Sequence, residues 1–479
     1  MLTIMEKQNL INILISIGLV LTATVYGFFI GRGLEIISYA LVGAVLLLAY
    51  IIFSIKYPIH GLLVFIFSIP FERIPSLPIG GANLRISQVL LAGMIAAFLI
   101  RKLISKSFIL RYSPYLWVYI TVVISLLLSF SHMLAISRGM MVFAFIIFTS
   151  LTIWVIPAIL QTKDHLCLVI KVLFWVTIII SIFGLYQFAG DMIGLPMSLT
   201  GLKDVYTKVV FGYPRVQSVM QEPLYLANFL IIPLALVITL YIRKINVFSS
   251  KFFIGFIALV GLVFLMTISR GGYLGLAVTL AVIFFGSLLA LLRPHVITGA
   301  IITTMVLAVG LTLVINFSNA GRKAIEETQK HFFNALDTAS TLQRFSTFDQ
   351  AKEAFNEQPL TGIGIGNFGP WSTNYPDQLP ISGWPIVNNQ TLETLAETGM
   401  IGLGALLMFL LVLFVRSFGA LFRAKDPTLR AIILALISAL VGVLVQYQFF
   451  STLYIMHIWV LIALTIATQN IIFNSKLSD

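Results

Sequence analysis

Long apolar runs recur along the whole chain and are separated by short polar segments. Each run holds about 20 residues, which as a helix crosses roughly 30 Å of hydrocarbon. The pattern therefore predicts about fourteen transmembrane helices. Their expected positions are 10–31, 34–55, 59–71, 84–100, 114–131, 138–160, 166–188, 223–242, 252–268, 271–292, 296–316, 399–418, 430–448 and 453–473.

Two of these runs have more than one interpretation. The run 59–71 is short and interrupted by Pro70 and Pro75, so it either spans the membrane or re-enters it from one side. The run 10–31 resembles a signal peptide, but it lacks a small-residue cleavage site and further spans follow. We therefore expect it to remain as a helix.

The composition supports a membrane protein. Hydrophobic residues make up 59% of the chain and charged residues 10%, with a mean hydropathy of +1.02, which excludes an ordinary soluble domain. The single cysteine, Cys167, excludes an internal disulfide framework and is expected to serve packing. The net charge of +12 is spread over many loops, so no nucleic acid is expected as a partner.

The basic residues predict the orientation. With the N-terminus inside, short inner loops carry about twice as many Lys and Arg residues as short outer segments, as the positive-inside rule requires. The richest inner loops are 101–111, 243–251 and 416–430. We therefore expect both termini in the cytoplasm.

Two hydrophilic segments, 189–222 and 317–398, fall on the outer side of this threading. The second is about 80 residues long, and structured loops of that length are usually functional. Within it, 320–336 and 340–356 predict amphipathic helices. The expected fold is an all-α integral membrane protein of about 12–14 transmembrane helices with one large, partly helical extracytoplasmic loop. Its expected parts are eleven spans over 1–316, the loop over 317–398 and three spans over 399–479.

A glycine-rich segment, Gly362-Ile-Gly-Ile-Gly366-Asn-Phe368, lies in this loop. It is not a phosphate-binding Walker loop, because no Gly-Lys-Ser/Thr follows, and no βαβ pattern makes it a dinucleotide site. The segment is either a tight turn against the membrane surface or a wall of a substrate cleft.

Two arginines are candidates for chemistry at the outer face. Arg270, between two strongly apolar runs, costs about 3 kcal/mol unless it faces a cavity or a partner. Arg215 lies shortly before the span 223–242, followed by Glu222. Two guanidinium groups on one face suit a diphosphate, because each engages phosphate oxygens through two hydrogen bonds. The alternative for each is an interfacial anchor whose charge extends to water.

Several segments in this order resemble the O-antigen ligase and polymerase superfamily. Ser269-Arg270-Gly271-Gly272 before a span is similar to the arginine motif of that superfamily, and Arg215 with Glu222-Pro223 occupies the place of its first essential arginine. The outer loop also resembles it, through Arg344, the segment from Pro359 to Phe368, and the exit from Asn388 to Gly402.

The resemblance implies a fold like that of other membrane glycosyltransferases with lipid-linked donors (GT-C-like). It also implies transfer, at the outer leaflet of the bacterial inner membrane, of a glycan carried on undecaprenyl diphosphate. Arg215 and Arg270 would stabilise the leaving diphosphate in place of a metal, so no cofactor and no metal is expected. Residues that would contact substrate are Arg344, Asn389, Gly364 and Gly366.

One position departs from the family pattern. Asn388 stands where the ligases carry a histidine thought to contact or deprotonate the acceptor, and an amide orients a hydroxyl but does not take its proton near neutral pH. Glu222 is the candidate base, with a helix-start or ion-pair role as its alternative. Glu393 and Glu397 share one helix face, and Glu397 is expected to support the loop.

Three functions remain open at this point. A polymerase, which would act with a chain-length regulator, is favoured by Asn388 and by the Glu-Pro pair. A ligase would transfer the glycan to lipid A–core or another acceptor. A transporter of lipid-linked glycans should carry charged or polar residues deep in several spans and two related halves, whereas these spans are almost free of ionisable groups at mid-depth and no internal repeat is found. Trp371, Tyr375 and Trp384 are available either to stack on sugars or to serve as interfacial anchors or loop core.

Overall fold

The computed structural model describes residues 35–73, 76–79, 82–105, 113–207, 212–288, 339–375 and 384–474. The predicted helices 10–31, 296–316 and 320–336 lie outside these residues. Within the described part, one two-stranded hairpin accompanies a set of helices, nine of which are long and apolar enough to cross a membrane. Three shorter apolar helices add to these. The prediction of an all-α integral membrane protein is confirmed, with the hairpin as its one exception among the described residues.

The described residues form two compact units. The first contains α2 (Glu35–Lys56), α3 (Pro58–Ser68), β1 (Ser76–Ile79), β2 (Ala82–Arg85) and α4 (Ile86–Ile104). The Tyr50 hydroxyl donates to the Gly61 carbonyl at 2.9 Å and holds α2 against α3. Helix α3 ends before Pro70 and has 11 residues, about 17 Å of rise, which is too short to cross the hydrocarbon core. The paired four-residue strands were not predicted, because so short a pair shows no clear alternation.

The second unit contains most of the chain. Its helices are α5 (Tyr115–Leu128), η1 (Ser129–His132), α6 (Ile136–Ser150), α7 (Thr152–Ile159), α8 (Lys163–Met192), α9 (Met197–Thr200), η2 (Asp204–Tyr206), α10 (Pro223–Ile242), α11 (Ser250–Met266), α12 (Arg270–Leu288), α15 (Ala339–Glu357), α16 (Phe368–Trp371), η4 (Ser372–Asn374), α17 (Gln390–Arg423), α18 (Pro427–Gln446) and α19 (Met456–Asn474). The spans predicted in these ranges are observed within a few residues, and the predicted helix 340–356 is α15.

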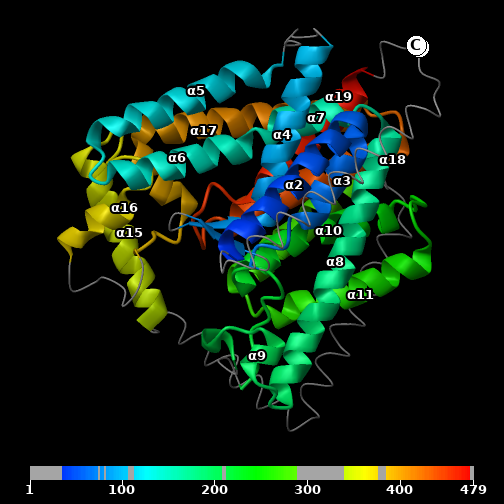
Figure 1. Ribbon diagram of the computed structural model, residues 1–479, viewed down its shortest axis with the longest axis horizontal. Helices are drawn as coiled ribbons and strands as arrows, with labels where there is room; N and C mark the ends of the chain where they lie inside the picture. Colours follow the sequence, from blue (N-terminus) through cyan, green and yellow to red (C-terminus); the bar gives the residue numbers. More distant parts are fainter. Residues whose placement is uncertain are drawn as a thin grey trace. The chain divides into compact units, whose positions relative to one another are not determined.

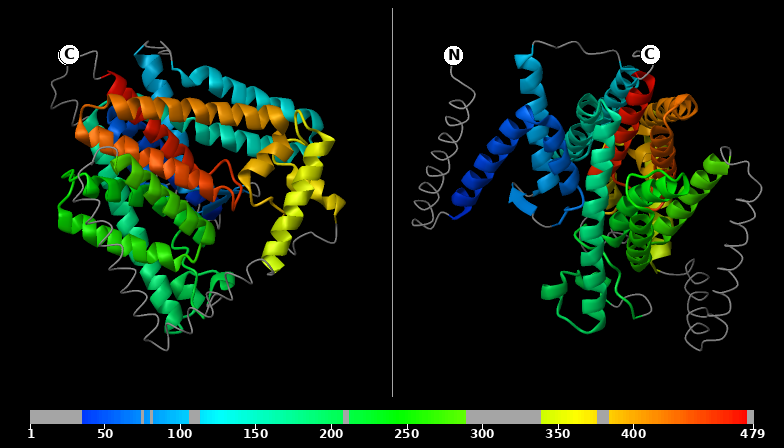
Figure 2. Two further views of the ribbon diagram at one scale, coloured as in Figure 1. Left: turned by 180° about the vertical axis from the view of Figure 1, so that it is seen from behind. Right: turned by 90° about the vertical axis from the view of Figure 1, so that its right-hand side faces the viewer.

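Helices α10, α18 and α19 form the core of the second unit. They are largely apolar, apart from buried polar side chains that pair with one another, such as Asn228 with Gln446 and His457, and 78%, 72% and 89% of their spanning windows are buried. Helix α18 packs against both α10 and α12, and α5 runs along α17 (Figures 1 and 2). On α17, by contrast, Leu411, Val415 and Phe422 are exposed, as expected for side chains that face lipid.

Small residues let α12 and α18 approach closely. A Cβ atom at Gly275 would lie 2.8 Å from the Gly442 carbonyl oxygen, and one at Gly442 would overlap the Thr279 side chain. The Thr279 hydroxyl donates to the Gly275 carbonyl at 2.8 Å, so it is satisfied within its own helix. Close backbone contact through small residues is a common means of holding helices together in lipid, where apolar burial gives little drive.

Helix α17 is broken at Gly399, and the break separates its polar beginning from its spanning part. Gly399 has φ 64° and ψ −167°, outside helical values. The Met400 amide donates to the Pro359 carbonyl at 2.9 Å and the Ile401 amide to the Leu360 carbonyl at 3.2 Å, which ties the break to the end of the outer loop. Residues 390–398 therefore belong with the loop, and the predicted span begins at the break.

Candidate active site

Backbone contacts fix Arg215 at the end of α11. Its amide donates to the Tyr206 carbonyl at 2.8 Å, and the next amide, that of Val216, donates to the Met266 carbonyl at 3.0 Å. The guanidinium Nε donates to the Thr267 carbonyl at 3.4 Å, and the group lies over the Tyr206 ring, 5.8 Å from its centroid. Arg215 is thus held in place by the fold and is not a freely extended surface side chain.

Arg270 is the first residue of α12 and its side chain is exposed. The Ser269 hydroxyl accepts a hydrogen bond from the Gly272 amide at 3.2 Å and so caps the first turn. A Cβ atom at Gly272 would lie 2.8 Å from Ala227 of α10, and one at Gly271 would lie 2.9 Å from Phe449. The two glycines therefore allow close helix packing, which positions Arg270 at this end of the unit.

The predicted residues Arg215, Arg270 and Glu222 come together in the structure. Burial holds the pKa of Arg215 below its usual value, repulsion from Arg270 adds to this effect, and attraction from Glu222 opposes it. Such mutual influence requires the three charges to lie near one another. Glu222 is the N-cap residue of α10, but its side chain makes no capping hydrogen bond. Its carboxylate is therefore free to balance the arginines.

Two further cations, Arg73 and Lys203, join this group. An Arg73 guanidinium nitrogen donates to the Ser218 carbonyl at 3.3 Å, and Lys203 Nζ donates to the Gln221 carbonyl at 2.7 Å. Burial lowers the pKa of Lys203, while Glu222 attracts and Arg73 repels its charge. We call Arg73, Lys203, Arg215 and Arg270, together with Glu222, the cationic cluster.

Arg73 and Lys203 were missed as site residues from the sequence, where they counted only as outer charges. Both side chains are held by backbone carbonyls of the segment 212–222. Ser218 has φ 52°, its amide donates to Gln187 Oε1 and its hydroxyl to the Ile180 carbonyl, both at 2.7 Å. This anchor on α8 turns the backbone carbonyls of the segment toward the two cations.

The glycine-rich turn folds against α17. Gly362, Gly364 and Gly366 have φ values of 71°, 102° and 71°, which L side chains rarely adopt. A Cβ atom at Gly362 would lie 2.3 Å from the backbone of Glu397. The Glu397 carboxylate accepts hydrogen bonds from the Gly366 amide at 2.8 Å and the Phe368 amide at 3.0 Å. Glu397 thus supports the loop, as the sequence indicated.

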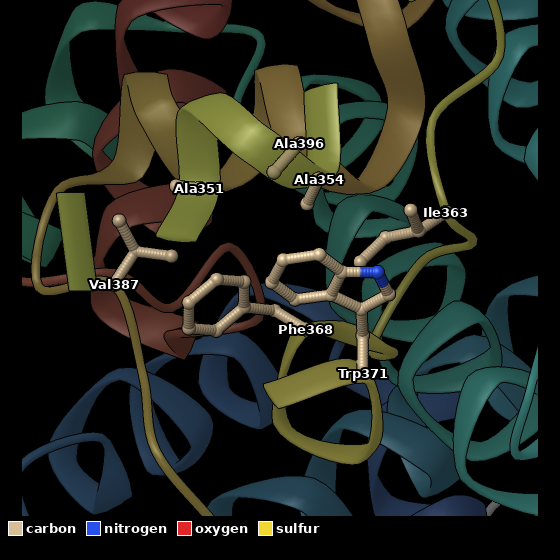
Figure 3. Close-up of a cluster of buried hydrophobic side chains, with 7 residues drawn as sticks. All are labelled: Ala351, Ala354, Ile363, Phe368, Trp371, Val387 and Ala396. Carbon is tan, nitrogen blue, oxygen red and sulfur yellow. The ribbon is translucent and has the colours of Figure 1, made fainter. Parts of the chain in front are cut away.

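Behind the turn, α15 covers a small hydrophobic core. Figure 3 shows Phe368 and Trp371 of α16 directed toward Ala351 and Ala354 of α15. The core consists of Ala351, Ala354, Ile363, Phe368, Trp371, Val387 and Ala396. Trp371 is 3% exposed and its indole donates to Glu357 at 2.9 Å. Of the two roles left open for Trp371, the structure supports loop core, whereas Trp384 is exposed and lies beside Arg138.

The predicted exit residues have structural contacts. The Asn389 side chain caps α17 by accepting from the Leu392 amide at 3.0 Å, and its Nδ2 donates to Gln448. Asn388 has φ 56° and donates to the Ile386 carbonyl at 3.3 Å. Both amides therefore shape the turn that enters α17.

The other residues predicted to contact substrate, Gly364, Gly366 and Arg344, lie in different surroundings. Gly366 lines a partly open cleft beside α17 with Arg138, Gln390 and Glu393, while Gly364 lies against Met133 outside its lining. Arg344 belongs to α15, but its side chain lies outside the described residues. In the part of the chain that the structure describes, His, Cys, Asp and Glu do not gather in threes as a metal site would need.

Residues 254–407 match the family model described as O-antigen ligase. The matched segment includes Arg270, the glycine-rich turn and the start of α17, whereas Arg73, Lys203, Arg215 and Glu222 precede it. No curated protein matches the chain.

Proposed function

Because the match to the O-antigen ligase family supports membership of the O-antigen ligase and polymerase superfamily, we propose that this multi-pass membrane protein is a glycosyltransferase. It moves a glycan from undecaprenyl diphosphate to an acceptor sugar hydroxyl. The observation that carries this proposal is the cationic cluster, in which Arg215 lies near both Arg270 and Glu222, and Glu222 lies near Lys203 as well.

The chemistry of such a transfer needs positive charge at the leaving group. As the bond between the anomeric carbon and the diphosphate oxygen breaks, charge grows on the diphosphate. Guanidinium groups that are already in position stabilise that charge without reorganisation. Arg215, held by Thr267 and Tyr206, is prepared in this sense. Because arginines supply the charge, we propose a metal-independent reaction, with inversion at the anomeric carbon from a single displacement.

The proposed location follows from the helix ends. The cluster lies where α8 and α11 end and where α10 and α12 begin, and the hydropathy threading assigns these ends to the outer side. We therefore propose an active site at the outer leaflet of the bacterial inner membrane, with the C-terminus in the cytoplasm.

We favour the polymerase form, in which the acceptor is another lipid-linked glycan. Asn388 supports this choice, because its amide cannot replace the family histidine as a base. A ligase, with lipid A–core or another acceptor, is the second candidate, and the description of the matched family favours it. A reaction with purified lipid-linked repeats separates the two, since a polymerase forms a ladder of products and a ligase transfers once.

The test of the proposed function is transfer by the purified protein carrying Arg215→Ala or Arg270→Ala. Each change should lower the rate about 10²–10³-fold, as expected for the loss of one charge-stabilising donor. Arg→Lys should restore little, because a point charge does not reproduce the two-pronged hydrogen bonding of arginine. Arg423→Ala, an exposed arginine at the opposite end of α17, serves as the control. Full activity of both alanine variants would contradict the proposal.

A further inference from the structure

A partly open cleft of about 80 Å³ lies between the glycine-rich turn, α6 and the start of α17. Its polar lining includes Arg138, Gln390, Glu393, Ser451, Thr452 and Tyr454. These groups offer several hydrogen-bond donors and acceptors, as sugar hydroxyls require. The cleft is open on one side, so it admits the hydroxyl-bearing edge of a sugar ring.

Glu393 and Glu397 both line this cleft, but their carboxylates differ in what they bind. Both oxygens of Glu397 accept backbone amides of the turn. In Glu393, Oε2 accepts from the Ser451 hydroxyl at 2.5 Å and from the Val387 amide at 3.2 Å. Among the described residues, no hydrogen bond engages Glu393 Oε1. Glu393 is also only partly buried, whereas Glu397 is 5% exposed.

The charged groups that face Glu393 in the described structure are Arg138 from α6 and Glu397 from its own helix, with the Tyr454 phenol on the α18–α19 loop. Arg138 Nε donates to the Gly366 carbonyl at 2.7 Å, which fixes the guanidinium at the wall of the cleft. One arginine against two carboxylates leaves the cleft without excess positive charge. The cleft therefore suits a hydroxyl rather than a diphosphate.

The cleft borders the cationic cluster. Thr452 lines the cleft, and its hydroxyl lies 3.4 Å from that of Tyr225. Tyr225 stands three residues after Glu222, one turn into α10. A donor held at the cluster and an acceptor held in the cleft would thus meet across Tyr225 and Thr452.

We propose that the cleft binds the acceptor sugar and that Glu393 takes the proton of its attacking hydroxyl. This assignment rests on the proposed function. The hydroxyl oxygen forms a bond to the anomeric carbon, and the bond from that carbon to the diphosphate breaks. The electron pair leaves with the diphosphate, and the hydroxyl proton passes to Glu393 Oε1 and then to water.

Glu222 is less suited to this step. It lies within reach of Lys203 and Arg215, and protonation would remove the negative charge that separates these cations. Glu393, by contrast, has a single arginine nearby, Arg138, and shares it with Glu397. Asn388, in the position of the family histidine, precedes α17 and is not part of the cleft lining, whereas Glu393 in the first turn of α17 is.

The assignment is tested with the full-length protein in detergent and a purified undecaprenyl-diphosphate-linked glycan as donor and acceptor. Glu393→Gln should lower the turnover number about 10²–10⁴-fold, the range typical of losing a positioned base. The Michaelis constant for the donor should stay within about threefold, and the rise of the rate with pH at its acidic side should disappear. In Glu393→Ala, added formate should restore part of the rate.

Glu397→Gln is the matched control. It removes a carboxylate of the same cleft and the same helix, but both oxygens of that carboxylate already accept hydrogen bonds from backbone amides. It should lower the melting temperature yet keep the pH dependence, and formate should not affect Glu397→Ala. If the wild type is active and Glu393→Gln has an unchanged rate and pH profile, the proposed role of Glu393 is wrong, whereas the proposed function still stands. A wild type that transfers no lipid-linked glycan would contradict the proposed function itself.

Discussion

The cationic cluster and the Glu393 cleft belong to the same unit, but the backbone groups that hold their charged side chains are of opposite kinds. In the cluster, backbone carbonyls hold the cations: Ser218 holds Arg73, Gln221 holds Lys203 and Thr267 holds Arg215. In the cleft, backbone amides of the glycine-rich turn hold a carboxylate, that of Glu397. We propose that the first region binds an anion and the second a sugar hydroxyl, so that donor and acceptor occupy separate places.

The two regions also differ in how they depend on the chain. The cluster collects side chains from around residues 73, 203, 215–222 and 270, and three of its cations, Arg73, Lys203 and Arg215, each have a backbone anchor. The cleft depends on one turn whose glycines leave no room for side chains. Loss of a cluster residue should weaken one contact, whereas damage to the turn should remove the whole cleft.

The largest expected effect is therefore that of Gly362→Ala. The new Cβ would lie 2.3 Å from backbone atoms of Glu397 at a φ of 71°, which costs on the order of 3 kcal/mol or more. Transfer should fall below detection, while donor binding at the cluster should persist. Gly404→Ala on α17, where a Cβ would have nothing within 4 Å, is the control and should leave melting temperature and activity unchanged. Equal activity of the two variants would contradict the importance of the turn.

A smaller effect is expected from Arg73→Gln and Lys203→Gln in the cluster. Each should weaken donor binding about tenfold, equivalent to ~1.4 kcal/mol, and should make binding less sensitive to salt. The turnover number should change little, because neither residue is proposed to stabilise the transition state. Binding titrations at two ionic strengths measure this, with Lys425→Gln, exposed between α17 and α18, as the control. An unchanged affinity would remove Arg73 and Lys203 from the donor site.

Asn388→Gly should have a still smaller effect. Asn388 has a left-handed backbone that glycine adopts without strain, and its amide donates within its own turn. Steady-state transfer should remain within about threefold of wild type, since the lost hydrogen bond is local. A fall of about thirtyfold, ~2 kcal/mol, would instead show that this amide touches the acceptor, as the family position implies.

The smallest expected effect is that of a chelator. If arginines stabilise the leaving diphosphate, excess EDTA should leave the initial rate of transfer unchanged, and added Mg²⁺ should not raise it. An activity that disappears with EDTA and returns with Mg²⁺ would contradict the metal-independent mechanism while leaving the assignment of Glu393 intact.

The sequence predicted the elements of this fold closely because their signals are local. Apolar runs predicted the described spans from α4 to α19 within a few residues, and the glycines at 362–366 marked the turn, whereas the break of α17 at Gly399 was not predicted. The hairpin after α3 was missed, since two four-residue strands carry too little pattern. Arg215, Arg270 and Glu222 were also found from local context, because arginines at the ends of apolar spans are conspicuous.

By itself, then, the sequence determined a membrane-spanning helical protein, its glycine-rich turn and two arginines placed for an anion. Only the tertiary structure decided which distant charges join them, because the positions of Arg73 and Lys203 depend on the backbone carbonyls of a segment that is anchored at Ser218. It also distinguished Glu393 from Glu397, which share one helix face. The amides that donate to Glu397 come from a turn about 30 residues earlier in the chain. Helix periodicity predicts which residues share a face, but it does not predict a partner from another segment.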